Sequence, residues 1–385
     1  MTALPAGWKS LSFDEAVEPI SDEGKRVDQS DYLTEGKLPV VDQGEQFIGG
    51  YTNDSSKAYN GPLPVVIFGD HTRRVKFVDF PFVIGAQGVK LLRPREGWFP
   101  KFFAYLLPTR DLPDRGYSRH YQFVRKLQFP QPPEPEQRRI VAEIEKQFTR
   151  LEAGVAALRR VQANLHRYRA AVLKAAIPAT GTPQVRLEQL AEKGALVLYG
   201  ILQPGPGVPD GVPYVRPTEI DQDNILLEQI RRTSPAIAAK YKRSVLKAED
   251  IILSIVGTIG KVAIVPASLE GGNITQSSVR IRPDRTQVGE KYLAWVLRSP
   301  FAIKQYDAAR LGTAVPRLNV AHVRDLLIPV PPLADQERIV AEVERRLSVV
   351  EELSALVTAN LQRATRLRQS ILQQAFEGKL LRPRT

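Results

Sequence analysis

The chain lacks cysteine altogether and has a single methionine among its 385 residues. Without cysteine it can form neither a disulfide framework nor a thiolate metal site, so a reducing cytoplasm is the expected compartment. No apolar run approaches the roughly 20 residues of a membrane span, and residues 1–15 lack the apolar stretch of a signal peptide. We therefore expect a cytoplasmic protein without a membrane segment.

The motifs of common catalytic sites are also missing. The sequence has no GxGxxG after a first strand, no Asn/Asp-Pro-Pro-Tyr/Phe methylation tetrapeptide, no zincin motif and no complete P-loop. Residues 257–261 (GTIGK) lack the earlier P-loop glycine, and Val262 stands where serine or threonine is needed. His71 follows Asp70, but no second histidine lies at metal-ligand spacing. We predict no catalytic residue, no metal site and no cofactor held by the chain itself.

Acidic residues are outnumbered by basic ones. Lys and Arg total 54 against 42 Asp and Glu, which gives a net charge of +12. This excess favours a polyanionic partner such as nucleic acid, although many basic proteins bind nothing acidic. The length exceeds that of one ordinary core and suits two globular modules with connectors.

A long internal repeat organises the chain. Residues 129–145 (FPQPPEPEQRRIVAEIE) recur 199 positions later as residues 328–344 (IPVPPLADQERIVAEVE), with ten of seventeen residues identical. The same offset pairs Glu152 with Glu351 and Arg169 with Arg368. A weaker echo relates residues 87–94 to 276–283, and residues 101–107 to 291–297. The pattern predicts a tandem duplication. The repeated segments that begin at residues 129 and 328, called the arms, are preserved, whereas the segments that precede them, called the bodies, have diverged.

Each repeated arm is predicted to be a long helix. A Pro-Pro pair and an acidic first turn mark its start, and apolar residues then follow at alternating spacings of three and four, which is typical of a coiled-coil seam. The seam positions are Val141, Ile144, Phe148, Leu151, Val155, Leu158, Gln162, Leu165 and Val172 in the first arm, and Val340, Val343, Leu347, Val350, Ser354, Val357, Leu361, Ala364 and Ile371 in the second.

The charge distribution predicts the direction of pairing. Residues 154–175 and 353–374 contain no Asp or Glu but five and three basic residues, whereas residues 134–153 and 333–352 are net acidic. An antiparallel arrangement places each acidic half against a basic half. We expect an antiparallel pair; the alternative is two amphipathic helices, each packed on its own domain.

The bodies at residues 1–128 and 179–327 contain short β-branched or aromatic runs broken by Gly and Pro, which predicts strands with a few helices. Two hairpins are expected, at residues 64–80 and 250–265. Polar residues at expected turns are candidates for DNA contact through phosphates or base edges, although plain solvation is the alternative for any single one. They are Asn53, Ser55, Lys57, His71, Thr72, Arg73, Arg74, Arg115, Ser118, Arg119 and His120 in the first body, and Tyr214, Arg216, Lys240, Lys242, Arg243, Thr258, Lys261, Gln276, Thr313 and Arg317 in the second.

The twice-repeated entry into a long helix, alternating with two unlike bodies, resembles the specificity subunit of type I restriction-modification systems. The residues that carry this resemblance are Gln137, Arg139, Ile140 and Val141, with Gln336, Arg338, Ile339 and Val340. Residues 68–73 and 85–88 resemble one type of target-recognition domain, and residues 214–217, 251–261 and 315–318 resemble another. The chain departs from the usual Gly-Asp before the second hairpin, where it has Glu249-Asp250.

The resemblance implies an α+β fold with two strand-rich target-recognition domains and two long helices that form an antiparallel coiled coil in a pseudo-twofold tandem repeat. The expected divisions are residues 1–128 and 179–327 for the target-recognition domains, and residues 129–178 and 328–385 for the helical spacers. It further implies a non-catalytic subunit that binds double-stranded DNA. Each domain would read half of a bipartite, asymmetric site, and the helices would set the gap between the halves.

The implied partners are two adenine methyltransferase subunits, with restriction and translocase subunits in the full complex. S-adenosylmethionine, ATP and Mg²⁺ are expected on these partners. Two other functions fit less well. A methyltransferase with fused recognition domains requires the missing tetrapeptide, and a coiled-coil scaffold that ignores DNA predicts little salt-sensitive binding.

Overall fold

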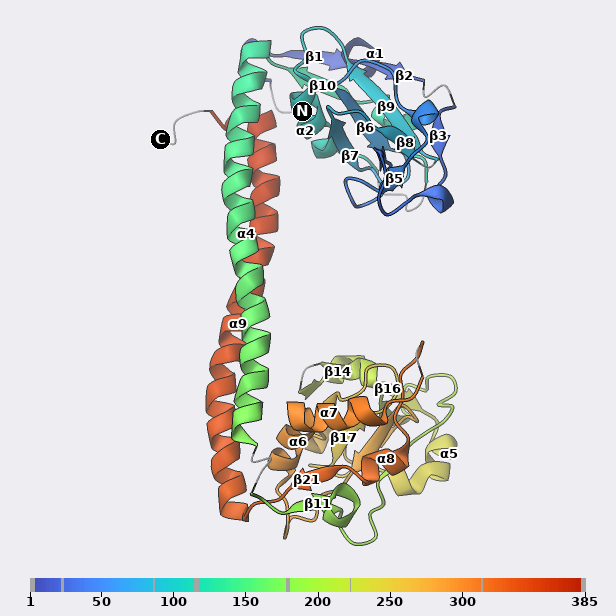
Figure 1. Ribbon diagram of the computed structural model, residues 1–385, viewed down its shortest axis with the longest axis vertical. Coiled ribbons are helices and arrows are strands. Elements are labelled where there is room, and N and C mark those ends of the chain that lie inside the picture. The colour runs from blue at the N-terminus through green and yellow to red at the C-terminus, as the bar shows by residue number, and fades with distance from the viewer. Residues whose placement is uncertain are drawn as a thin grey trace. The chain divides into compact units, whose positions relative to one another are not determined.

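The computed structural model describes residues 4–21, 24–85, 87–113, 118–177, 181–221, 223–312 and 314–381. The chain divides into two compact units, residues 1–158 with 359–385 and residues 159–358. Each unit contains one strand-rich body, half of one long helix and half of the other (Figure 1). Within the described residues, no helix combines the length and apolarity that crossing a bilayer requires.

The body of the first unit is built on two four-stranded sheets. One is antiparallel, in the order β2 (Val17–Ile20), β9 (Val89–Pro94), β6 (Val65–Gly69) and β7 (Val75–Val78). The other has the order β3 (Arg26–Val27), β8 (Val83–Gly85), β4 (Leu38–Val41) and β5 (Gly50–Thr52), with β8 parallel to both neighbours. Strand β1 (Lys9–Ser12) pairs antiparallel with β10 (Gln128–Gln131), which brings the first and last strands of the body together. Its helices are α1 (Phe13–Ala16), α2 (Pro100–Leu106) and α3 (Tyr121–Val124).

Strand β6 shows why this body needs so many apolar residues. Its residues are all buried, because alternate side chains point to opposite faces and both faces are covered. Val66 and Phe68 join the core that includes α2, whereas Val65 and Ile67 join the core against the second sheet. The predicted hairpin at residues 64–80 is confirmed, since β6 pairs with β7 from Val65 opposite Val78 onward.

The second body repeats the first sheet in the same order. Strands β12 (Leu198–Tyr199), β20 (Ser278–Ile281), β17 (Ile251–Ser254) and β18 (Val262–Ile264) correspond to β2, β9, β6 and β7. A second sheet has the order β16 (Arg231–Thr233), β13 (Val212–Val215) and β19 (Asn273–Ile274), and β11 (Gln184–Arg186) pairs with β21 (Leu327–Pro329). A small hairpin joins β14 (Ile220–Asp221) to β15 (Asn224–Ile225). The helices are α5 (Pro235–Ala238), α6 (Glu290–Arg298), α7 (Pro300–Ala309) and α8 (Val320–Arg324).

The weak sequence echo therefore corresponds to β9 with β20 and to α2 with α6. The second predicted hairpin is confirmed in the pairing of β17 with β18. Short 3₁₀ segments occupy turns of both bodies: Gln29–Asp31, Ser55–Lys57, Leu107–Thr109, Leu187–Leu190, Pro217–Glu219, Leu227–Gln229, Ala239–Ser244 and Ala267–Leu269. The α+β fold class with a tandem repeat is confirmed.

The two long helices are α4 (Glu134–Ala176) and α9 (Leu333–Phe376), and each begins at the residue that follows a Pro-Pro pair. In the first unit, the start of α4 packs on the end of α9, for example through Ile144 and Phe148 with Ile371. In the second unit, the end of α4 packs on the start of α9 through Val172 and Val343. Pairing is antiparallel in each unit, as predicted, and the alternative of two helices packed only on their own bodies is wrong.

Two ion pairs follow the repeat. In the first unit, Arg368 contacts Glu152 at 3.2 Å and lies 4.0 Å from the ring centre of Phe148. In the second unit, the equivalent Arg169 lies 3.8 Å from Glu351. In both pairs an arginine from the basic half of one helix meets a glutamate from the acidic half of the other, as the charge argument predicts for an antiparallel arrangement. Three of the four side chains are about half exposed or more, and Arg169 is 22% exposed. Each pair therefore contributes only about 0–1 kcal/mol, so the contacts favour one direction of pairing more than they add stability.

One buried amide in each unit joins the arm to the body. Gln137 accepts a hydrogen bond from Phe99 N at 2.7 Å and donates to the carbonyls of Gly97 and Pro132, both at 2.8 Å. Its equivalent Gln336 accepts from Gly289 N at 2.9 Å and donates to the carbonyls of Gln287 and Pro331, at 3.0 and 2.9 Å. The glutamine of the repeated motif thus connects the Pro-Pro segment to the turn before α2 or α6.

Candidate nucleic-acid interface

The tip of the first hairpin presents four of the predicted contacts, His71, Thr72, Arg73 and Arg74. Arg73 has a positive φ of 58°, and its N–H donates to Gly69 O at 2.8 Å, which makes the turn tight. Thr72 is exposed but donates its hydroxyl to Gln43 O at 2.8 Å. The tip is therefore held in one shape by its own backbone and by the neighbouring loop.

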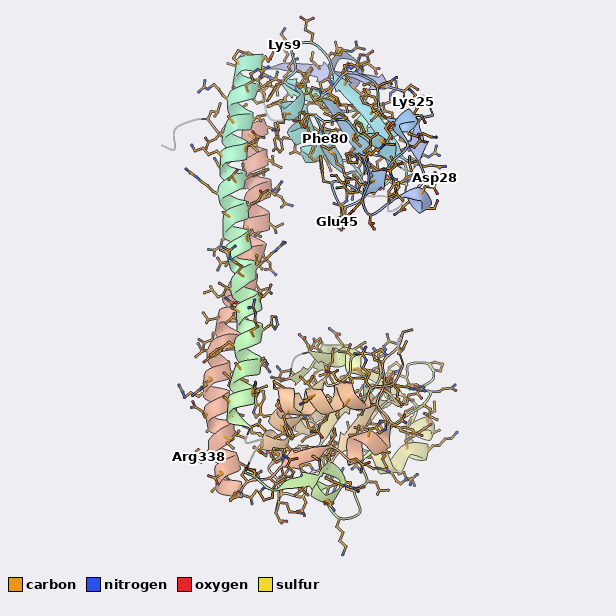
Figure 2. The ribbon with its side chains drawn as sticks, in the orientation of Figure 1. Lys9, Lys25, Asp28, Glu45, Phe80 and Arg338 are labelled. Atoms are coloured by element: carbon orange, nitrogen blue, oxygen red, sulfur yellow. The ribbon has the colours of Figure 1, made fainter. Side chains whose placement is uncertain are left out.

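Gln43 is a residue that the sequence did not single out. Its side chain accepts from His71 N at 3.1 Å and donates to Gln87 O at 2.8 Å, so it ties the hairpin tip to the turn before β9. The same loop carries Glu45, which lies 3.6 Å from Arg74 and appears at the edge of the body in Figure 2. No spacing in the sequence relates residue 43 to residues 71 and 87.

His120 and Tyr121, near the end of the first body, are hydrogen-bonded to Asp70 at the base of this tip. His120 donates its N–H to Asp70 O at 2.8 Å, and its ring Nδ1 lies 3.0 Å from the same oxygen. Asp70 in turn accepts from Tyr121 N at 2.7 Å. Ser118 and exposed Arg119 are thereby placed beside the tip, whereas the His120 side chain is only 1% exposed and faces the interior. Arg115 lies outside the described residues.

A third group of predicted contacts lies elsewhere on the first body. Asn53, Ser55 and Lys57 follow β5 in the second sheet, and Asn53 accepts from Lys37 N at 3.1 Å. Asn53 and Ser55 are exposed, and Lys57 is half-buried. These residues and the β6–β7 tip form two separate polar groups on one body.

In the second body, three predicted contacts converge at the loop after β17. Gly257 N donates to Pro316 O at 2.9 Å, and Val256 forms a bridge with Arg317. Ile255 N donates to Ser277 O at 2.8 Å, next to Gln276. The structure thus brings exposed Thr258, Gln276 and Arg317 together from three distant segments. Thr313 lies outside the described residues.

Other predicted contacts are engaged within the protein. The Lys261 amine donates to the carbonyls of Pro217 and Ile220 at 3.0 and 2.6 Å, and Tyr214 is 5% exposed. Arg216 pairs with buried Glu219. Burial alone raises the pKa of Glu219, but hydrogen bonds from Arg216 and Thr218 outweigh it and hold the pKa below its ordinary value. These groups shape the loops around the exposed residues.

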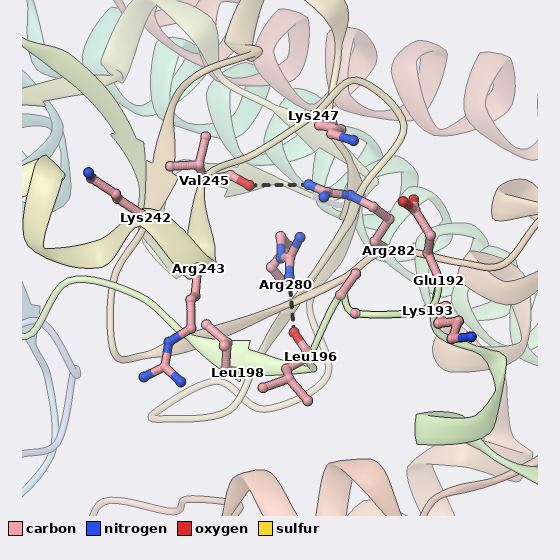
Figure 3. Close-up of a pocket in the computed structure, with 12 residues that line it drawn as sticks. Glu192, Lys193, Leu196, Leu198, Lys242, Arg243, Val245, Lys247, Arg280 and Arg282 are labelled. Atoms are coloured by element: carbon pink, nitrogen blue, oxygen red, sulfur yellow. Dashed lines mark hydrogen bonds between the residues drawn. The ribbon is translucent and has the colours of Figure 1, made fainter.

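Lys240, Lys242 and Arg243 are exposed on the 3₁₀ segment Ala239–Ser244. Ser244 fixes this segment by donating its hydroxyl to Asn273 Oδ1 at 2.7 Å. Lys242 and Arg243 also line a cavity of about 400 Å³ that contains two further arginines from β20 and the residue after it, Arg280 and Arg282 (Figure 3). Sequence reasoning missed both arginines because the strand pattern alone gives no sign of their surroundings.

The described residues contain no group of three or more His, Asp or Glu side chains placed to hold a metal ion. The exposed members of the predicted contact set carry hydroxyls, amides and cations. Such groups can donate hydrogen bonds to phosphate oxygens or base edges.

Comparison with known proteins finds similar sequences. Residues 177–360 match the family model described as the type I restriction modification DNA specificity domain. The chain is 27% identical over 275 residues to the EcoBI specificity subunit of Escherichia coli, a match that covers 65% of this chain and 58% of that protein. It is also 25% identical to the EcoDI specificity subunit of Escherichia coli, covering 98% of this chain and 89% of that protein.

Two solved structures share the fold. One comes from work on complex assembly and conformational transition of the type I restriction-modification system, with a TM-score of 0.72 and 19% identity over 99% of this chain and 100% of that one. The other is the HsdS subunit from Thermoanaerobacter tengcongensis, with a TM-score of 0.51 and 20% identity over 98% of both chains. Residues 177–360 of this chain thus match the type I DNA specificity domain, and the chain as a whole is similar to specificity subunits of type I restriction-modification systems.

Proposed function

We propose that this chain is the sequence-specific, double-stranded DNA-binding subunit of a type I restriction-modification complex. The observation that carries the proposal is a repeated sheet order in two bodies whose loops display different polar residues. A repeated scaffold with unlike loops suits the reading of two unlike half-sites. The target-recognition domains are residues 1–128 and 179–327, and the helical spacers are residues 129–178 and 328–385.

The proposed contacts are the exposed or half-buried members of the predicted set at the first hairpin tip, around the loop after β17 and on the 3₁₀ segment Ala239–Ser244. We place His71–Arg74 with Arg119 on the first half-site, and Thr258, Gln276 and Arg317 on the second. Lys240, Lys242 and Arg243 supply additional positive charge. His120 and Tyr214 are left out because their side chains are buried, and Arg216 and Lys261 position loops through their internal contacts.

The chain itself catalyses nothing in this proposal. It positions DNA for two adenine methyltransferase subunits and, in the full complex, for restriction and translocase subunits in the cytoplasm, and those partners hold S-adenosylmethionine, ATP and Mg²⁺. Helix α9 offers a surface for a partner, since Val349, Leu353 and Leu356 are exposed at helical spacing on one face.

Duplex binding should depend steeply on salt. If the chain neutralises six or more phosphates, its affinity should fall by roughly 10³-fold or more between 50 and 200 mM salt. Arg119→Gln and Arg317→Gln should each reduce the slope of log K against log salt by about one. The measurement is fluorescence anisotropy of a labelled duplex. Lys304→Gln, an exposed position on α7, is the matched control. A flat salt dependence would favour the scaffold that ignores DNA.

Lengthening both helices should lengthen the gap between half-sites. Seven residues inserted after Leu158 in α4 and after Thr358 in α9 preserve the heptad phase and add about 10 Å to each helix, or roughly three base pairs. Long-read detection of methylated adenines in cells that express the chain with its methyltransferase subunits reports the new gap. The same insertion in α4 alone mismatches the two helices and should abolish methylation. An unchanged gap in the double insertion contradicts the spacer role.

A further inference from the structure

Strand β20 carries a buried arginine with incomplete partners. Arg280 is 2% exposed. It donates from Nη2 to Leu196 O at 3.0 Å, while its Nε has no hydrogen-bond partner among the described residues. A buried guanidinium with an unused donor is costly, because water no longer solvates it.

The carboxylate paired with this guanidinium, that of Asp250, already accepts hydrogen bonds from other donors. Asp250 accepts from Arg282 through both oxygens, at 2.7 and 2.8 Å, and from Lys247 N at 2.8 Å. Arg280 Nη1 lies 4.0 Å from it. Asp250 therefore faces two guanidinium groups, and Glu192 is a second carboxylate close enough to act on both. Burial and the charge of Arg282 lower the pKa of Arg280 below its ordinary value, although Asp250 and Glu192 act in the opposite direction.

Arg280 is one of the residues that line a cavity of about 400 Å³. Figure 3 shows Arg280 in the centre, with Arg243 on one side and Arg282 with Glu192 on the other. Lys193, Lys242, Arg243 and Lys247 add four cations to the two arginines, and Glu192 is the only acidic residue in the lining. The cavity is large enough for a tetrahedral oxyanion, and its charge excludes a cation.

We propose that this cavity is a binding site for a phosphate-type anion, with Arg280 as its buried anchor and Lys247 as a cation at its rim. The planar guanidinium can donate to an anion oxygen, a geometry for which arginine is well suited, and a small turn of the side chain brings the buried, unused Nε donor toward the cavity. The anion can be a DNA backbone phosphate or free phosphate. The first source rests on the proposed DNA binding, and the second does not.

The test is isothermal titration of the full chain with inorganic phosphate at fixed ionic strength and pH 7.5. Wild type should show saturable binding at one site. Arg280→Met should weaken it about tenfold or more, because a charged hydrogen bond is lost in a partly dry site, and Arg280→Lys should lie between the two. Lys304→Ala is the control and should bind as wild type does.

A second variant covers the case in which Arg280→Met does not fold. Lys247 is exposed, and Lys247→Ala should fold while weakening phosphate binding about two- to fivefold through the lost charge. Absence of saturable binding by wild type, or unchanged affinity in the folded Arg280→Met protein, would overturn the site. Unchanged affinity of Lys247→Ala for phosphate would show that Lys247 does not contribute to the site.

Competition distinguishes the two sources of the anion. If the site takes a backbone phosphate, inorganic phosphate should weaken duplex binding more than sodium chloride does at the same ionic strength, and Arg280→Met should abolish that difference. If it takes free phosphate, duplex and phosphate should bind independently. A chain that binds phosphate but no duplex would contradict the proposed function and leave the anion site standing.

Discussion

Replacing Gln137 with leucine should lower the free energy of unfolding of the first unit by about 3 kcal/mol. The substitution leaves Phe99 N and the carbonyls of Gly97 and Pro132 without their partner, and each unmade buried hydrogen bond costs ~1 kcal/mol or more. Urea unfolding followed by the fluorescence of Trp8 and Trp98, which lie in the same unit, measures the change.

The repeat supplies an internal check on this prediction. Gln336→Leu should destabilise the second unit by a similar amount, which the fluorescence of Trp295 reports, because the equivalent three groups lose their partner. Gln362→Leu, at an exposed position of α9, is the matched control and should change stability by less than about 0.5 kcal/mol. A loss below 1 kcal/mol at both Gln137 and Gln336 would show that the amides are not what joins arm to body.

Replacing Asp250 with asparagine should destabilise the second unit by about 3–5 kcal/mol, because removing one partner of a buried ion pair leaves an uncompensated charge. Asp250 is 1% exposed and is the carboxylate that faces both Arg280 and Arg282. The amide keeps the shape of the side chain but carries no charge and turns a donor toward donors. Urea unfolding followed by Trp295 fluorescence measures the loss.

The neighbouring residue provides the control. Glu249 pairs with Arg285, and both side chains are about half exposed. Glu249→Gln should therefore cost no more than about 1 kcal/mol. Equal effects at the two positions would mean that burial does not distinguish them. At the departure Glu249-Asp250, Glu249 holds a positive φ of 69° at the turn where glycine was expected, and Asp250 is buried.

The helical arms were predictable to a large extent. Most of the predicted seam residues are buried or half-buried, including Ile144 and Phe148 in the first unit and Val343 and Leu347 in the second. Gln162 is an exception and is exposed. Both hairpins were predicted as well, because a strand–turn–strand segment is contained in about fifteen residues and its turn residues mark its ends.

The candidate interface was predicted less well. His120 and Tyr214 follow the same polar-residue reasoning as Arg119 and Arg317, yet they are buried while the two arginines are exposed. Residue type alone does not decide which side of a loop faces solvent. Gln43 was missed for a related reason, since its partners are 28 and 44 residues away in sequence.

The amino-acid sequence by itself determined the duplication, the two helices, their antiparallel direction and the excess of positive charge. These properties follow from periodicity and from charge distributed along a segment, and both act between near neighbours or between equivalent repeats. The tertiary structure alone decided which polar groups pair in the interior. Gln137 meets Gly97 and Asp250 meets Arg282 only when segments some 30 to 40 residues apart pack together, and the cost of burying an unpaired polar group then selects those partners.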